Sequence, residues 1–255
     1  MRLLKILLVL VILLLIVLGV FAWTLPADLA YRYAANYLGP VTLSGVRGSV
    51  WNGHADGVSA FGRDLGELDW RLEKAPLLHR QLVADLRIKG ADVDAAGAVT
   101  RNPDDTLVVR DLRFRFPAGL LEPALDVPAL KLLGTISGVL TQATLANGFI
   151  RGAIGNARWS EAGVSGQAEA RFSDILADFA SRSDGSIAGT VHDDGQGNLK
   201  VDGSFSVRVD GYDAQARLVA RNGDPQVMEM LRYIGQPQPD GSSKLVIHGR
   251  LFKLF

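Results

Sequence analysis

The chain has 255 residues, and its 27 Lys and Arg residues balance its 27 Asp and Glu residues. This neutrality argues against nucleic acid as a partner, because sequence-independent binding of nucleic acid depends on a basic surface. There is no cysteine, so an exported domain would fold on its hydrophobic core without disulfides.

An apolar segment near the N-terminus has no charged or strongly polar side chain from Ile6 to Trp23. Its 18 residues would form a helix of about 27 Å, close to the hydrocarbon thickness of a bilayer. Arg2 and Lys5 precede it and the next cation is Arg32, so the positive-inside rule keeps residues 1–5 cytoplasmic. We therefore expect a single-pass bacterial inner-membrane protein with most of the chain in the periplasm.

A cleaved signal peptide is the alternative interpretation of this segment. The apolar region of a signal peptide is usually about 7–15 residues long and ends in a small-residue cleavage site. The run here is longer, and Val20-Phe21-Ala22 is only a weak site. Trp23 at the outer end suits an interfacial aromatic anchor. The pattern favours a retained transmembrane helix at 6–23 and leaves cleavage open.

A short amphipathic helix is expected next, within residues 24–40. Pro26 suits the first turn of a helix, and Gly39-Pro40 would end it. Tyr33 and Tyr37 lie four residues apart, which places them on one face. This helix would lie beside the membrane.

Residues 41–255 show an apolar period of two, which indicates strands with one apolar and one polar face. The clearest example is Leu199 to Val209, whose apolar set includes Phe205. Short helical turns are expected at Pro117–Leu130, and a short helix at Pro225–Gly235. The prediction is a mainly β, antiparallel ectodomain that is curled or sandwich-like, with a few short helices.

An internal similarity suggests two repeated sheet units, near residues 41–116 and 131–220. In each, a Gly-rich strand precedes a Trp-bearing strand by about twenty residues. Trp51 and Trp70 belong to the first unit, and Trp159 belongs to the second. Such repetition is typical of sheets built from successive hairpins.

Catalytic and metal-binding motifs are not found in the sequence. His54, His79, His192 and His248 lack metal-ligand spacing, and no nucleophile elbow or phosphate loop occurs. The run His192-Asp193-Asp194 could bind calcium through its carboxylates, but such runs are more often solvated hairpin tips. We expect no enzymatic activity, no catalytic residue, no metal and no cofactor.

The tryptophans and their flanking glycines are the most informative motif. Gly48 and Gly53 surround Trp51, and they allow close strand approach or a bend beside a large ring. The structural interpretation is that Trp51 and Trp70 anchor the core. In the functional interpretation, they line a groove for a partner or a lipid chain, together with Trp159 and Phe205. A charge at Phe205 is expected to unfold the domain, whereas a groove would tolerate it and lose binding.

The order of these motifs resembles the type II secretion system protein N family of Gram-negative bacteria. After the apolar N-terminal segment, the motifs are Gly48-Ser49-Val50-Trp51-Asn52-Gly53-His54-Ala55, Leu68-Asp69-Trp70-Arg71-Leu72, the Gly-rich strand Leu132–Leu140, Trp159, and Gly211-Tyr212 through Gly235 to Gly249-Arg250-Leu251. The resemblance implies a bitopic inner-membrane protein with a periplasmic β-rich domain, associated with the machine that exports folded proteins across the outer membrane. It implies neither enzymatic activity nor a cofactor.

A broader similarity is to AsmA-like envelope proteins, whose long sheets curl into lipid-holding grooves. Two functions therefore compete. One is an accessory or structural subunit that contacts other inner-membrane or periplasmic components of the secretion machine. The other is a lipid- or hydrophobe-binding module, for which small residues on the apolar side, such as Gly138, Gly203 and Gly249, would leave room.

Overall fold

The computed structural model describes residues 24–37, 39–60, 62–122, 131–166 and 169–249. The strands within these ranges form one open, antiparallel sheet of 16 strands. The predicted mainly β, antiparallel fold is therefore confirmed. The sandwich-like alternative is wrong for the described residues, because a sandwich needs two sheets. So many strands in one sheet are expected to twist and curl.

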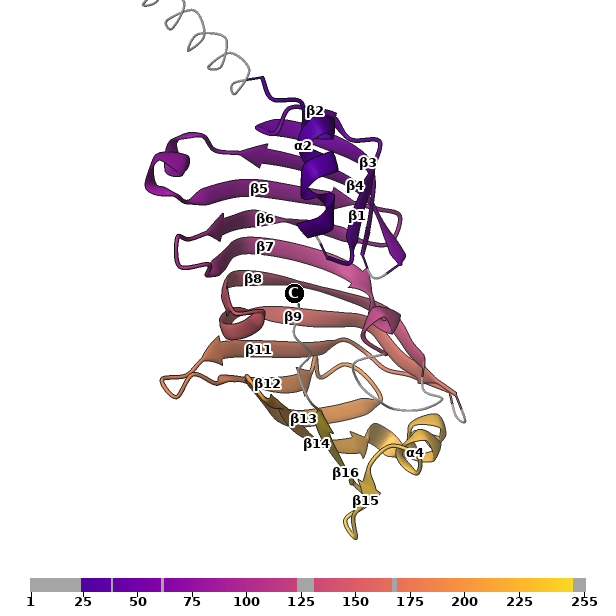
Figure 1. The fold of residues 1–255 in the computed structure, drawn as a ribbon. Coiled ribbons are helices and arrows are strands. Elements are labelled where there is room, and N and C mark those ends of the chain that lie inside the picture. Colours follow the sequence, from indigo (N-terminus) through magenta and orange to yellow (C-terminus); the bar gives the residue numbers. More distant parts are fainter. Residues whose placement is uncertain (1–23, 38, 61, 123–130, 167–168, 250–255) are drawn as a thin grey trace, which may run out of the picture.

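The strands lie beside one another in nearly their chain order, as hairpin connections dictate (Figure 1). The exceptions are β2 and β10, which pair only with β3 and β9, and β16, which lies between β14 and β15. The strands are β1 (Val41–Ser44), β2 (Arg47–Gly48), β3 (Asn52–Ala60), β4 (Arg63–Leu72), β5 (Leu82–Lys89), β6 (Asp94–Arg101), β7 (Leu107–Pro117), β8 (Lys131–Ala146), β9 (Phe149–Ser165), β10 (Ala170–Arg171), β11 (Ile175–Ser181), β12 (Ile187–Asp193), β13 (Leu199–Arg208), β14 (Gly211–Ala220), β15 (Gln236–Pro237) and β16 (Ser243–Gly249).

Three of the hairpin turns share one local hydrogen-bond pattern. In each, an aspartate carboxylate accepts from both the backbone N–H and the hydroxyl of the residue two positions later. This pattern stabilises a tight turn without help from distant residues. The three pairs are Asp104 with Thr106, Asp184 with Ser186, and Asp240 with Ser242.

Bulges interrupt the longest strands. The register shifts between Ala96 and Ala98, opposite Asp111, which has a φ of 51°. A second shift lies at Gly134 opposite Glu161, where both residues have positive φ. A bulge adds a residue to one strand, and it bends and twists the sheet locally. The curl of this sheet follows from such irregularities.

Two α-helices lie at opposite ends of the described sheet (Figure 1). Helix α2 (Ala27–Ala34) continues into η1 (Ala35–Tyr37) and packs beside β2. Helix α4 (Pro225–Leu231) confirms the short helix predicted before the last strand. The other helical turns are η2 (Ala75–His79), η3 (Ala118–Leu121) and η4 (Arg221–Gly223).

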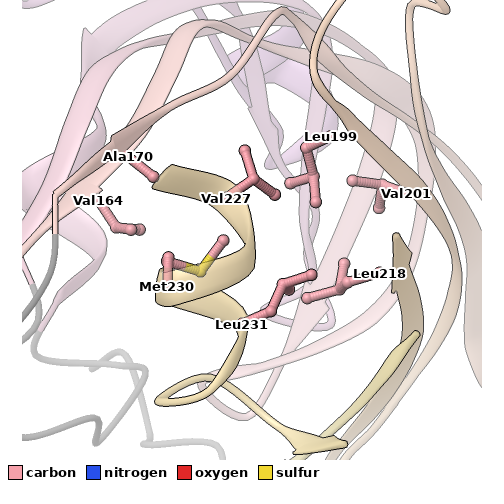
Figure 2. Packing of buried hydrophobic residues seen from close by; sticks show 8 residues of the cluster. All are labelled: Val164, Ala170, Leu199, Val201, Leu218, Val227, Met230 and Leu231. Carbon is pink, nitrogen blue, oxygen red and sulfur yellow. The ribbon is translucent and has the colours of Figure 1, made fainter. Parts of the chain in front are cut away.

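Helix α4 covers one end of the apolar side of the sheet (Figure 2). Val227 is fully buried, and Met230 and Leu231 are also buried, against side chains from β9, β10, β13 and β14. The Asp224 carboxylate accepts from the Val227 N–H at 3.0 Å and so caps the helix N-terminus. The strand residues of this cluster are Val164, Ala170, Leu199, Val201 and Leu218.

Some predicted features fall elsewhere or outside the described residues. Val209 lies in the turn between β13 and β14 rather than in the strand. Leu251 and the segment Ile6 to Trp23, with Arg2 and Lys5, lie outside the described residues. Among the residues that the structure does describe, no helix is long and apolar enough to cross a membrane.

Candidate functional site

Strand pairing gathers the apolar side chains of the sheet onto one face, called here the apolar face. One row of directly opposed residues crosses twelve strands, from β3 to β16, without a single polar or charged side chain. The row is Ala55, Leu68, Ile88, Ala95, Phe114, Gly138, Ala157, Ala177, Val191, Gly203, Ala216 and Leu245.

A second, parallel row is equally apolar. It is interrupted only where the bulge at Asp111 shifts the register between β6 and β7. Its members are Gly53, Trp70, Leu86, Gly97, Leu112, Leu140, Gly155, Phe179, Gly189, Phe205, Ala214 and Ile247.

The described helices cover the apolar face only in part. Helix α4 packs on β10 and β14, and α2 lies beside β2 at the other end. Between these ends, Ile88, Ala95, Phe114 and Leu140 keep part of their surface exposed to solvent. Large exposed apolar patches mark interaction sites, so this part of the apolar face is the candidate site.

The tryptophan and glycine motif of the first strands forms one compact unit. Gly48, with a φ of 85°, lies opposite Gly53 in the β2–β3 pair. Gly53 in turn lies opposite Trp70, whose ring occupies the space that a Cβ atom at Gly53 would need. The Trp70 indole N–H donates to the Val50 carbonyl at 3.0 Å. The lack of a side chain at Gly53 is therefore required for the ring to lie on the sheet.

Trp51 has a different environment from Trp70. It is partly buried immediately before β3, and the Lys74 ammonium lies 5.1 Å from the centre of its ring. This is the geometry of a cation–π contact. Trp51 and Trp70 thus both belong to the first hairpins, as the sequence suggested, but only Trp70 belongs to the paired rows of the apolar face.

Trp159 and Phe205 lie far from this unit, on later strands. Trp159 packs against the α4 cluster, and its indole N–H donates to the Leu133 carbonyl at 2.6 Å. Phe205 is partly buried on β13, with its ring centroid 6.3 Å from that of Phe179. The structure therefore distributes the predicted groove residues along the apolar face and does not gather them into one pocket.

The opposite face carries the polar and charged side chains, including histidine–aspartate pairs between neighbouring strands. His54 Nδ1 lies 2.8 Å from Asp69, and His248 Nδ1 lies 3.0 Å from Asp213. The hydrogen bond that the His54 ring donates to the Asp69 carboxylate raises the pKa of His54 above its ordinary value. A shallow hollow of about 900 Å³ lies over strands β11 to β16 and is lined by charges of both signs, such as Asp178 and Arg208.

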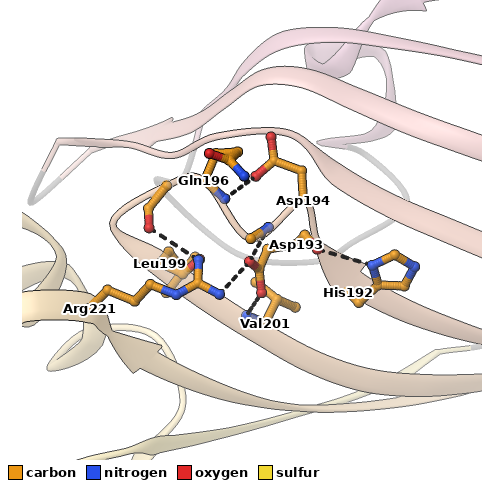
Figure 3. Close-up of polar contacts among 9 residues, drawn as sticks. His192, Asp193, Asp194, Gln196, Leu199, Val201 and Arg221 are labelled. Atoms are coloured by element: carbon orange, nitrogen blue, oxygen red, sulfur yellow. Dashed lines mark hydrogen bonds and ion pairs between the residues drawn. The ribbon is translucent and has the colours of Figure 1, made fainter.

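The aspartate run at the end of β12 forms hydrogen bonds and an ion pair within the protein itself (Figure 3). The Asp193 carboxylate accepts from the Gly195 and Val201 N–H groups, both at 2.8 Å, and pairs with Arg221 at 2.7 Å. Asp194 accepts from the Gln196 N–H at 2.9 Å. These bonds support the hairpin-tip interpretation, and no group of three or more potential metal ligands occurs among the described residues.

Three relationships depend on the pairing register and could not be predicted from the sequence. These are the Arg221–Asp193 ion pair, the rings that lie over directly opposed glycines, and the bond from the Leu43 N–H to the Tyr31 hydroxyl at 2.8 Å. Aromatic residues and glycines that occur near each other in the sequence hint at such ring–glycine packing. The glycine that each ring covers, however, lies on a neighbouring strand, which the sequence does not identify.

Comparison with known proteins gives two matches. Residues 39–246 match the model of a family described as "Type II secretion system (T2SS), protein N". The chain is also similar to "Type II secretion system protein N" of Vibrio cholerae serotype O1, with 27% identity over 216 residues that cover 79% of this chain and 81% of that protein. No solved structure matches the chain. Both matches agree with the resemblance drawn from the order of the motifs.

Proposed function

We propose, because the chain belongs to the type II secretion system protein N family, that it serves this machine as a non-catalytic subunit that binds other components in the periplasm. Family membership makes it a component of type II protein secretion. Our proposal adds the mode of action, which is contact between proteins through the apolar face of the sheet.

The observation that carries the proposal is the unbroken apolar row across twelve strands. A sheet that only needed a stable core would bury such a row under a second layer. Here the two described α-helices contact the sheet at its ends, and between them the helical turns η2 and η3 contact β5 and β8. The centres of protein interfaces are apolar and depleted in charge, and the middle of this row meets that description.

The proposed topology places the segment Ile6 to Trp23 in the inner membrane, with Arg2 and Lys5 on the cytoplasmic side. Fourteen strands follow one another in the main path of the sheet, and strands are spaced about 4.8 Å apart. The path is therefore on the order of 60 Å long, without correction for twist. An anchor beside β1 would leave the rest of this length available to periplasmic partners.

Ala95 and Ala96 provide a matched test of the apolar face. They are adjacent on β6, but Ala95 belongs to the apolar row whereas Ala96 lies opposite Arg87 and Arg113 on the polar face. A photo-crosslinking residue is placed at each position in turn, in the full chain within secreting cells. We expect a protein adduct containing another secretion component from position 95 and none from position 96.

Glutamate substitutions at the same two positions test the function. Ala95→Glu places a charge on the apolar face and is expected to reduce export, whereas Ala96→Glu gains arginine neighbours and should support normal export. Thermal unfolding of both variants checks that each remains folded. Normal export by a folded Ala95→Glu variant, together with no protein adduct at position 95, would refute the proposal.

A lipid-binding function is the second candidate, and the same apolar row favours it. An acyl chain needs an apolar path without charges, and the row supplies one from β3 to β16. The photo-crosslinking experiment separates the two functions, because a lipid ligand yields adducts of lipid mass from position 95. Mass spectrometry of the full chain, extracted in mild detergent, adds a second measurement. Absence of co-purifying lipid, with only protein adducts, would reject the lipid function.

A further inference from the structure

The two edges of the sheet differ in whether the outward-facing backbone N–H and C=O groups of the edge strand already have hydrogen-bond partners. At the first edge, β1 is only four residues long, and its Leu43 N–H donates to the Tyr31 hydroxyl of α2 at 2.8 Å. Leu43 lies opposite Val58 of β3. Because the Leu43 N–H bonds to Tyr31 and not to β3, it points away from β3, toward the open edge of the sheet. Helix α2 therefore occupies a backbone donor that another strand would need.

The last edge is open by comparison. Strand β15 pairs with only Ser243 and Lys244 of β16. Gly235, with a φ of 85°, precedes β15 in the chain. The stretch Leu245–Gly249 pairs with β14 on one side and has no described partner on the other. It is called here the free stretch.

The free stretch also lacks the usual devices that prevent edge pairing. Natural edge strands carry lysines, prolines or inward charges that discourage another strand from adding. Leu245, Val246, Ile247, His248 and Gly249 include none of these, and Val246 is 40% exposed. His248 Nδ1 lies 3.0 Å from the Asp213 carboxylate of the neighbouring strand β14, so its polar atom is engaged within the sheet.

Two copies of the free stretch match in polarity when they pair antiparallel with Ile247 at the centre. In an antiparallel pair of two copies centred on this residue, Ile247 faces its own equivalent, Leu245 faces Gly249, and Val246 faces His248. Directly opposed residues share one face of a sheet, so Leu245 and Ile247 of both copies continue the apolar face across the junction. A two-fold axis produces this arrangement, which is the commonest symmetry of soluble oligomers.

We propose that the free stretch of β16 pairs with the free stretch of a second copy, which joins the two sheets into one. This dimer uses a surface separate from the middle of the apolar face. Backbone hydrogen bonds supply the attraction, and the continuous apolar faces fix the register, as in other cases of strand addition.

The absence of cysteine in the chain permits a direct test by disulfide cross-linking. Ile247→Cys in the full chain gives one thiol per copy, and the proposed pairing brings the two Cα atoms to about 4.5–5.5 Å, within reach of a disulfide. Mild oxidation of membranes should yield a covalent dimer on a non-reducing gel. Thr42→Cys, an exposed position on the guarded β1 edge, is the matched control and should stay monomeric.

A second substitution shows whether the edge itself causes the cross-link. Val246→Lys adds the kind of charge that guards natural edges, and it should strongly reduce the Ile247→Cys cross-link. Val246→Thr, which favours strands, should retain it. The unmodified full chain in detergent should show a concentration-dependent dimer by sedimentation, a measurement that needs no variant to fold.

Three results would overturn the proposal. They are a monomer at every concentration, a cross-link that Val246→Lys leaves unchanged, and an Ile247→Cys adduct formed only with a different protein. The last result would assign the edge to a heterologous strand.

Discussion

The indole ring of Trp70 covers Gly53, the residue directly opposite it on the neighbouring strand. Four other rings lie against directly opposed glycines. At Gly189 and Gly249 the ring is the closest group to the position that a Cβ atom would take, whereas at Gly138 and Gly155 a backbone carbonyl oxygen is closer than the ring. The expectation that Gly138 and Gly249 leave room on the apolar face is therefore wrong. The four pairs are Phe114 with Gly138, Phe179 with Gly155, Phe205 with Gly189, and Tyr212 with Gly249.

Gly53→Ala should destabilise the protein by about 1–3 kcal/mol, the usual cost of adding a methyl group to a packed site. All three atoms nearest to the added Cβ belong to the Trp70 ring, so the ring must move and weaken its hydrogen bond to Val50. Denaturant unfolding measures the loss. In a Trp70→Leu background the same substitution should cost much less, and an equal cost in both backgrounds would contradict the ring as the cause.

Tyr31→Phe should loosen the first edge of the sheet. The variant removes the hydroxyl that accepts the Leu43 N–H, and a bond of this kind contributes about 0.5–1.5 kcal/mol. Hydrogen exchange at the Leu43 amide should become faster. Tyr33→Phe is the control, since Tyr33 is 82% exposed. Equal exchange rates in the two variants would show that Tyr31 does not protect the edge.

Leu231→Ala should remove about 2–5 kcal/mol of stability, because it leaves a cavity where α4 packs on the sheet. Leu231 is 6% exposed within the α4 cluster. Met228→Ala is a control on the same helix, since Met228 is 48% exposed, and it should be nearly neutral. Thermal unfolding of both variants tests the difference. Similar losses in the two would argue that helix propensity, rather than burial, decides the stability of α4.

Arg221→Met should destabilise the protein by about 3 kcal/mol, because it leaves the Asp193 carboxylate buried without its cation. The Asp193 side chain is only 6% exposed. Asp193→Asn in the same variant removes the unpaired charge and should restore part of the stability. Arg217→Met is the control: the Arg217–Asp240 pair is largely exposed, so little change in the unfolding midpoint is expected.

Acidification should reduce stability through the same aspartate. Burial by itself would raise the pKa of Asp193, but hydrogen bonds from the Val201 N–H and Arg221 outweigh burial and lower the pKa. The resulting stabilisation is present above the unfolded-state pKa of about 3.9 and is lost as the pH falls through the lower folded-state pKa. Unfolding free energies between pH 6 and pH 3 should therefore decrease, less steeply in Arg221→Met. A profile that stays flat down to pH 3 would contradict this.

The alternation of apolar and polar residues was sufficient to predict most strands and their faces. Leu199 to Val207 lies in β13 as expected, and Tyr212 to Leu218 shows the same alternation in β14, because the side-chain period of a strand is a local property. The short helix from Pro225 was equally predictable, since proline geometry acts over a few residues. The aspartate hydrogen bonds in the turns at Asp104 and Asp240 are local in the same way.

The candidate site was predicted only in part. The sequence identified Trp70, Gly53 and Phe205, but it gave no indication that Gly53 faces Trp70 or that Phe205 faces Gly189. These facts depend on the register between strands, which bulges such as the one opposite Asp111 change by a residue.

By itself, the sequence determined a neutral, cysteine-free β protein whose strands each have one apolar face, because composition and a period of two are encoded residue by residue. Only the tertiary structure decided that the described strands form one open sheet rather than two. It also decided that one edge is guarded by Tyr31 while the edge at Leu245–Gly249 is free. Register, curvature and edge protection arise from contacts between residues far apart in the chain, and no local pattern specifies them.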